Sequence, residues 1–257
     1  MRVRRFSLLL FAGWLLLAGG PAAQAQLQWQ DNSLTWLYGG GFEVQPEWQH
    51  TGTFEHVSGW HWGDVFAFVD YTRFQGEADF FSGRRTWYGE ISPRLSLGKL
   101  SGREWSAGPV RDVLVAATLE AGEGDVETWL LGPAVDLDVP GFDFVQLNVY
   151  RRWPNGGRDG DTWQFTPVWS LTVPLAGSQF VFDGFIDWVI NSDRSFRRNL
   201  HINPQFKYDL GQRFGWRAKR LMVGLEYSYW SNRFGIADTP AFNTDQQALS
   251  LLLKSHL

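Results

Sequence analysis

The 257-residue chain contains no cysteine, which excludes disulfides, thiolate nucleophiles and cysteine-bound zinc. Positive charge is also scarce, because 23 Lys and Arg stand against 27 Asp and Glu, for a net charge of −4. Nucleic-acid binding needs concentrated Lys and Arg to neutralise phosphates, so nucleic acid is excluded as a partner. Beyond residue 25, no apolar run approaches the roughly 20 residues of a membrane-spanning helix. Together these absences argue against nucleic-acid-binding, disulfide-stabilised and helical membrane proteins.

The first 25 residues have the three parts of a secretory signal peptide. Arg2, Arg4 and Arg5 form a basic region, residues 6–18 are mostly apolar, and Ala23-Gln24-Ala25 offers small residues for cleavage. A membrane-anchoring helix is the alternative, but the apolar stretch is shorter than the roughly 18 to 20 residues such a helix requires. We therefore expect residues 1–25 to be removed, which leaves 26–257. The segment carries three Arg and no acid, so the net charge falls from −4 to −7.

Aromatic residues are abundant in a chain that is polar on average. They make up 16% of the residues, with 15 Trp, yet the mean hydropathy is −0.24. A transmembrane β-barrel reconciles these values, because lipid-facing apolar residues alternate with polar lumen residues and aromatic girdles mark both membrane interfaces. The strands of a secreted soluble β-sandwich or barrel also alternate apolar with polar residues, so such a protein is the other interpretation.

Alternation of apolar and polar residues runs through the chain. In residues 144–152, Val145, Leu147 and Val149 fall on one face of a strand, while the intervening residues, from Gln146 to Arg152, are polar. The same pattern recurs in 162–173, 180–190, 199–210, 221–230 and 249–257. Lipid outside and water inside accounts for both faces, so the sequence predicts a membrane barrel.

The sequence predicts an all-β fold, an antiparallel up-and-down transmembrane β-barrel of about 12 strands over residues 26–257. An even strand number is usual for single-chain bacterial barrels, and each segment has about the length needed to cross the bilayer at a tilt. The predicted strands are 33–39, 50–60, 64–74, 86–97, 110–120, 127–138, 143–153, 162–173, 180–190, 199–210, 220–230 and 247–257.

Connections and prolines refine this prediction. With the N-terminus in the periplasm, turns near residues 62–63, 139–141 and 174–178 lie on the periplasmic side. The polar stretches 75–85, 154–161, 191–198 and 231–246 become outer loops. Proline removes a donor from the strand ladder, which predicts bulges or bends at four positions inside strands. These are Pro93, Pro133, Pro167 and Pro204.

Recognisable catalytic motifs are absent: the chain has no G-x-S-x-G, Walker loop or H-E-x-x-H. His50, His56 and His61 could meet at one end of the barrel, but no acid or cysteine completes a metal site with them. We therefore predict no enzyme activity, metal or cofactor. An active site on the barrel rim, as in membrane lipases, stays open as an alternative.

Inward positions combine aromatic rings with charged and amide groups. Aromatic faces stack on planar rings, while carboxylates and amides bond hydroxyl groups, so the set suits a path for a small solute. The alternative is that the rings fill a narrow barrel and the charges pair with each other. A twelve-stranded barrel has a narrow bore, which favours selectivity. The candidate lumen residues are Phe66, Phe68, Asp70, Tyr88, Glu90, Arg94, Asp136, Asp138, Asn148, Tyr150, Arg152, Asp183 and Asp187.

Several stretches, in order over roughly 180 residues, resemble the nucleoside-specific channel-forming proteins of Gram-negative outer membranes, the Tsx-like porins. They are G-D-V-F-A-F-V-D-Y (63–71), Y-G-E-I-S-P-R-L-S (88–96), W-L-L-G-P-A-V-D-L-D (129–138), L-N-V-Y (147–150), I-N-P-Q-F-K-Y-D-L-G (202–211) and V-G-L-E-Y-S-Y-W-S-N-R-F-G (223–235).

The resemblance implies a monomeric twelve-stranded barrel in the outer membrane that passes nucleosides by facilitated diffusion. It implies stacking by Phe66 and Phe68, and a polar lining by Glu90 and Arg94. By the same resemblance, the residues at matching inward positions are Asp136, Asp138, Asn148, Tyr150 and Asp187.

The chain departs from the family pattern at Ser92, at Val69-Asp70 and at Leu257, where such barrels usually end in Phe. The expected partners are outer-membrane lipids, small solutes and the barrel-assembly machinery. Two further readings remain: a non-selective narrow pore, and a plugged barrel that serves as a receptor for phage or other partners.

Overall fold

The computed structural model describes residues 27–257 except 77, 80–81, 125 and 155–160. The predicted signal peptide, residues 1–25, and most of the predicted outer loop 154–161 lie outside the described residues. The prediction of signal cleavage therefore stays a prediction.

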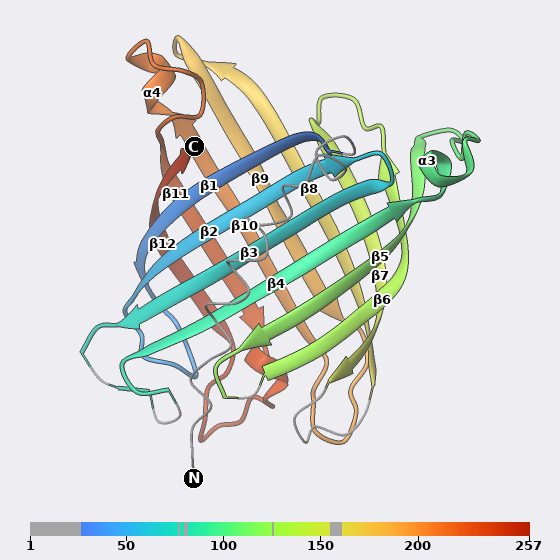
Figure 1. Cartoon of the computed structure of the whole chain (residues 1–257). Coiled ribbons are helices and arrows are strands. Elements are labelled where there is room, and N and C mark those ends of the chain that lie inside the picture. Colours follow the sequence, from blue (N-terminus) through green and yellow to red (C-terminus); the bar gives the residue numbers. More distant parts are fainter. Residues whose placement is uncertain (1–26, 77, 80–81, 125, 155–160) are drawn as a thin grey trace.

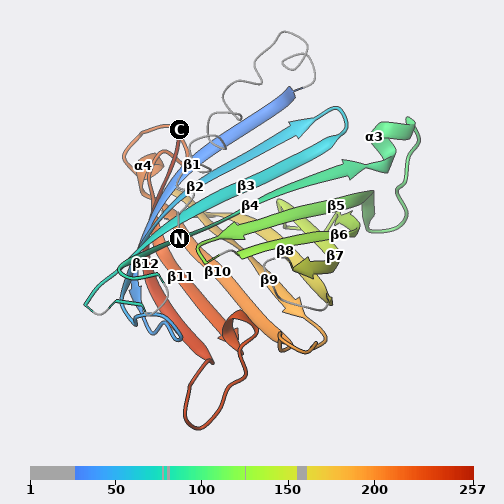
Figure 2. The ribbon, with the colours of Figure 1, turned by 60° about the horizontal axis from the view of Figure 1, so that its bottom comes forward.

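Twelve antiparallel strands form one closed barrel, in which every strand pairs with its sequence neighbours and β1 pairs with β12 (Figures 1 and 2). The predicted fold class is confirmed, and each predicted strand corresponds to one observed strand. The largest boundary difference is at the start of β1, which begins at Leu27 rather than at residue 33. The strands are β1 (Leu27–Gly40), β2 (Gln49–Trp60), β3 (Gly63–Phe74), β4 (Arg85–Ser96), β5 (Val110–Gly122), β6 (Val126–Leu137), β7 (Phe144–Pro154), β8 (Thr162–Leu175), β9 (Ser178–Val189), β10 (Asn199–Asp209), β11 (Met222–Ser231) and β12 (Gln246–His256).

The two ends of the barrel differ in their connections. The end where β1 starts and β12 ends has the shortest turns, residues 61–62 between β2 and β3 and 176–177 between β8 and β9. Two longer connections at this end contain the short helices α3 (Leu97–Ser101) and α4 (Leu210–Arg213). The opposite end has the longer loops, including residues 232–245 with the 3-10 helix η1 (Arg233–Gly235). Short turns are periplasmic and long loops extracellular in such barrels, which orients the chain.

The helices are minor features of the molecule. Within the described part of the chain, none of them has the length and apolar character needed to cross a membrane.

The outer wall is apolar and the inner wall polar, as the alternation predicts. On β12, Leu249, Leu251 and Leu253 expose 43–58% of their surface, while the residues between them are buried. Near the loop end, the neighbouring strands β6 to β9 each present one exposed Trp. An exposed apolar band with aromatic residues at its edge is stable in lipid and not in water. The four residues are Trp129, Trp153, Trp163 and Trp188.

The four strand prolines do not form bulges, so the prediction of bulges is wrong, while a bend at these positions stays a prediction. Each proline keeps its pair with one neighbouring strand and loses the pair on the other side, as Pro93 does toward β5. The register is the same before and after the gap at every one of them. One missing N–H therefore interrupts a single ladder locally, and the flanking pairs keep the same register on both sides of it.

Candidate functional site

One cavity of about 2140 Å³ follows the lumen, and inward side chains of all twelve strands line it. All thirteen predicted lumen residues lie along this cavity. Asp138 follows the last residue of β6 and lies at the mouth on the short-turn end. The placement is an observation, while a role for these residues in solute passage stays a prediction.

Three aromatic rings form a row along the lumen. Phe66 and Phe68 are two residues apart on β3, so both point inward, and their ring centres are 5.8 Å apart. Tyr88 on the paired strand β4 continues the row, with its ring centre 5.9 Å from that of Phe68. Phe66 exposes 37% of its surface to the cavity, so a ring face is available to a solute.

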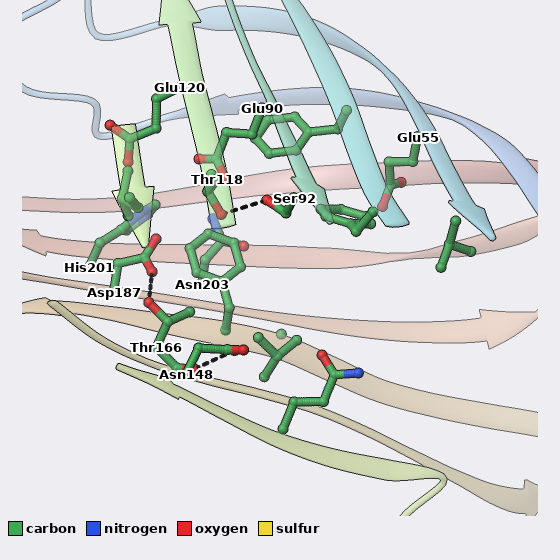
Figure 3. A pocket seen from close by; sticks show the side chains of 18 of the residues that line it. Glu55, Glu90, Ser92, Thr118, Glu120, Asn148, Thr166, Asp187, His201 and Asn203 are labelled. Atoms are coloured by element: carbon green, nitrogen blue, oxygen red, sulfur yellow. Dashed lines mark hydrogen bonds between the residues drawn. The ribbon is translucent and has the colours of Figure 1, made fainter. Parts of the chain in front are cut away.

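Polar side chains gather beside this row, and Figure 3 shows them pointing into one space from several strands. Glu90 accepts a hydrogen bond of 2.7 Å from the Tyr88 hydroxyl. Asp187 accepts from the Thr166 hydroxyl at 2.7 Å and from Gln164 at 2.8 Å. These contacts hold the carboxylates in place, and each carboxylate has further acceptor capacity for solute hydroxyls.

Basic side chains in the lumen are tied to acids along the wall. Arg94 on β4 donates to Asp64 on β3 at 2.7 Å and to Asp136 on β6 at 2.8 Å. Arg152 on β7 pairs with Glu120 on β5 at 2.7 Å. Each pair joins two strands that are adjacent or separated by a single strand. The pairs therefore lie along the wall of the barrel and do not cross the bore.

Two further pairs follow the same rule. Lys207 on β10 contacts Asp183 on β9 at 2.6 Å, and Lys254 on β12 contacts Glu55 on β2 at 2.5 Å, with only β1 between them. Of the predicted lumen residues, Arg94, Asp136, Arg152 and Asp183 are therefore held in ion pairs. For these four, mutual pairing, the alternative weighed from the sequence, describes the observed geometry.

The inward faces of β3, β4, β9 and β11 present four acids that have polar partners but, among the described residues, no ion-pair partner. Asp70 accepts a hydrogen bond from Thr53 at 2.6 Å, and Glu226 accepts one from Gln205 at 2.7 Å. Glu90 and Asp187 are the other two. The lumen thus has an excess of acceptor groups beside its aromatic row.

The loop-end mouth is shaped by Arg233, which exposes only 5% of its surface. Its guanidinium donates to the Glu43 carbonyl oxygen and, at 2.8 Å, to the Gln45 side chain, which joins the loop 232–245 to the loop 41–48. It also lies 4.5 Å from the ring centre of Phe234. Burial lowers the pKa of Arg233 to about 9, so the group stays charged at neutral pH. Arg233 and Phe234 both line the cavity and narrow this mouth.

The histidines of the β2 region do not converge. His50 stacks outside the barrel on Tyr38, with ring centres 4.5 Å apart, and His61 lies in the turn beyond the other end of β2. His56 contacts Asn32 at 2.8 Å. The possibility that the three meet at one end is therefore wrong, because they are spread over a whole strand.

Several lumen residues are absent from the predicted set, although the alternation contained the signal for them. Every second residue of β2, β5, β10 and β11 points inward just as in β3 and β4. Extending the pattern through these strands would have found them. They include Glu55, Thr118, Glu120, His201, Asn203, Lys207 and Glu226.

Comparison with known proteins connects this barrel to outer-membrane channels. The family model described as "Nucleoside-specific channel-forming protein, Tsx" matches residues 28–254. Outer membrane protein OmpK of Vibrio parahaemolyticus is 24% identical over 179 residues, which cover 68% of this chain and 66% of OmpK. The nucleoside-specific channel-forming protein Tsx of Klebsiella pneumoniae is 26% identical over 196 residues, which cover 65% of this chain and 64% of that protein. The chain thus spans a little under two thirds of the length of these relatives.

Among solved structures, the KdgM porin superposes with a TM-score of 0.51 at 8% sequence identity, covering 87% of this chain and 98% of the porin. At that identity the likeness shows the barrel fold alone.

Proposed function

Because this chain belongs to the family of nucleoside-specific channel-forming proteins of the Tsx type, we propose that it is a channel through which nucleosides cross the outer membrane by facilitated diffusion. The family consists of channels rather than enzymes, which leaves a rim-sited lipid enzyme without support.

The observation that carries the proposal is the row of Phe66, Phe68 and Tyr88 in a continuous cavity, with Glu90 directly beside it. A nucleoside has a flat base and a ribose with hydroxyl groups. The base can pass from ring to ring, while carboxylates and amides accept hydrogen bonds from the ribose.

The expected strength of these contacts suits transport. One aromatic stack on a base contributes about 1 to 3 kcal/mol. That is enough to concentrate the solute in the lumen and too little to retain it, which is the balance that conduction through a selective pore requires.

Swelling of liposomes that contain the purified protein tests the proposal. We expect faster entry of a nucleoside than of a sugar or an amino acid of equal size. Equal rates of entry for the three solutes would indicate a non-selective narrow pore. Protein-free liposomes and heat-denatured protein are the controls for leakage.

One observation favours a second candidate, a barrel closed at its loop end that serves as a receptor for phage or another partner. Arg233 fixes the loop 232–245 against the loop 41–48, and loop side chains line the cavity at this mouth. Planar-bilayer recording separates the two functions, because a closed receptor barrel conducts no current and a channel does.

A further inference from the structure

The connection between β10 and β11, residues 210–221, differs in charge from the rest of the chain. It contains Arg213, Arg217, Lys219 and Arg220 and no acid, in a protein whose net charge is −4. It also presents two aromatic side chains, Phe214 and Trp216, that are 64% and 54% exposed. These fractions exceed that of the lipid-facing Tyr71, which is 51%. We refer to residues 210–221 as the basic loop.

The basic loop is held in one shape by Asp209, which is fully buried. One carboxylate oxygen of Asp209 caps α4 by accepting from the Gln212 backbone N–H at 2.9 Å. The other oxygen accepts from the backbone N–H of Lys219 and from Gln179. Because Asp209 is used inside the loop, its charge is not presented to solvent beside the exposed arginines.

The basic loop extends along the rim of the barrel, from the β8–β9 turn to the end of β12. At one side the Ser178 hydroxyl, next to the β8–β9 turn, contacts Gln212 at 3.3 Å. At the other side Arg217 and Arg220 each donate a 3.0 Å hydrogen bond to oxygens of Leu257 and His256, where β12 ends. Figure 1 shows α4 beside the C-terminus at this end. The lipid-facing residues Leu251 and Leu253 of β12 begin just below.

These contacts do not neutralise the positive charges of the basic loop. None of Arg213, Lys219 and Arg220 forms an ion pair with any residue that the structure describes. The side chains of Arg213 and Arg220 are exposed. Exposed arginines beside exposed aromatic rings, at the level where the apolar wall ends, match the composition of the interface between lipid and water.

We propose that the basic loop binds the headgroups of anionic phospholipids in the leaflet that surrounds the short-turn end of the barrel. Phe214 and Trp216 enter the boundary between headgroups and acyl chains, and the exposed arginines Arg213, Arg217 and Arg220 contact the phosphates. One guanidinium group can donate two parallel hydrogen bonds to two oxygens of a phosphate, which favours arginine at such a site. The proposal does not depend on which solute the channel passes.

Native mass spectrometry of the folded protein, mixed with equal amounts of phosphatidylglycerol and phosphatidylcholine of the same chain length, tests it. We expect wild-type protein to retain phosphatidylglycerol preferentially. The variant R213Q/R217Q/R220Q should lose this preference by about tenfold, since each basic side chain near an anionic surface favours binding. The heat-modifiable gel shift of each variant verifies that the barrel is folded.

The matched control is R194Q/R197Q/R198Q, which removes three positive charges at the opposite end of the barrel. It should keep the wild-type preference. Wild-type protein that retains the two lipids equally would overturn the proposal, and would indicate that the loop serves a protein partner instead. An equal loss in both triple variants would also overturn it, because the preference would then follow from total charge.

Discussion

At the scale of single residues, Arg94 is the most highly connected charge of the lumen. Its side chain is 6% exposed, and its three nitrogens bond Asp64 and Asp136. The two acids come from β3 and β6, so one guanidinium on β4 links the two strands that flank the pair β4 and β5. Removing it would leave Asp64 without an ion-pair partner among the described residues and Asp136 with only the longer contact to Arg111.

We predict that R94Q lowers the free energy of unfolding by about 3 kcal/mol, since breaking a buried ion pair leaves uncompensated charge. Urea unfolding in detergent, followed by loss of the heat-modifiable band, measures the change. R111Q is the control, because Arg111 is 54% exposed and 3.5 Å from Asp136. Exposed pairs contribute less than about 1 kcal/mol, so R111Q should be nearly neutral. Equal effects of the two substitutions would contradict the assigned role of Arg94.

Phe66 and Phe68 are the residues through which we expect selectivity to act. The double variant F66A/F68A should lower nucleoside flux relative to flux of a small sugar by about fivefold, the effect of losing roughly 1 kcal/mol of stacking. Liposome swelling with both solutes gives the ratio.

The control F180A/F182A removes two phenylalanines at the same spacing from the outward face of β9, where neither lines the cavity. It should leave the ratio of the two fluxes unchanged. If F66A/F68A altered both fluxes equally, the rings would set only the width of the bore.

At the scale of elements, close approach of neighbouring strands depends on glycine at a few positions. A Cβ added to Gly132 on β6 would lie 1.9 Å from the Val149 carbonyl oxygen on β7, a backbone atom that cannot turn away. This is also where the β6–β7 ladder is interrupted, next to Pro133. A Cβ at Gly52 on β2 meets nothing within 4 Å.

We predict that G132A destabilises the barrel by about 1 to 3 kcal/mol, the usual effect of forcing an extra carbon into a packed site. G52A should be neutral or stabilising by about 0.5 kcal/mol, because alanine loses less backbone freedom on folding than glycine. Parallel urea titrations of the two variants provide the comparison. A G132A protein as stable as G52A would show that the β6–β7 contact relaxes freely.

At the scale of the whole molecule, the lumen carries an excess of negative charge. Asp70, Glu90, Asp187 and Glu226 line it without an ion-pair partner among the described residues. A narrow passage lined by one sign of charge concentrates the opposite ions.

We therefore predict that the open channel prefers cations, measured as a reversal potential in a KCl gradient at alkaline pH. E90Q/D187N should reduce the potential, because it removes two acids without an ion-pair partner from the lining of the passage. E127Q, on the outward face of β6, is the control and should have no effect. A current without cation preference would contradict this prediction and leave the channel function standing.

The sequence by itself determined the properties that depend on a period of two residues. Alternation along 249–257 predicted Leu249, Leu251 and Leu253 on the outside and Ser250 and Lys254 inside, as observed. The strand count and the placement of thirteen residues along the lumen follow from the same local geometry, because successive side chains of a strand point to opposite faces. The ordered motifs indicated the family.

Only the tertiary structure decided which inward groups meet. Lys254 and Glu55 are 199 residues apart and come together because β12 closes on β1 with a particular register. Arg94 reaches Asp136 across β5, while Asp70 and Glu90 have no ion-pair partner in the part of the chain that the structure describes. Whether Pro93 forms a bulge was likewise decided by the ladders on its two sides. Register and closure depend on all strands at once, and alternation within one strand contains no information about them.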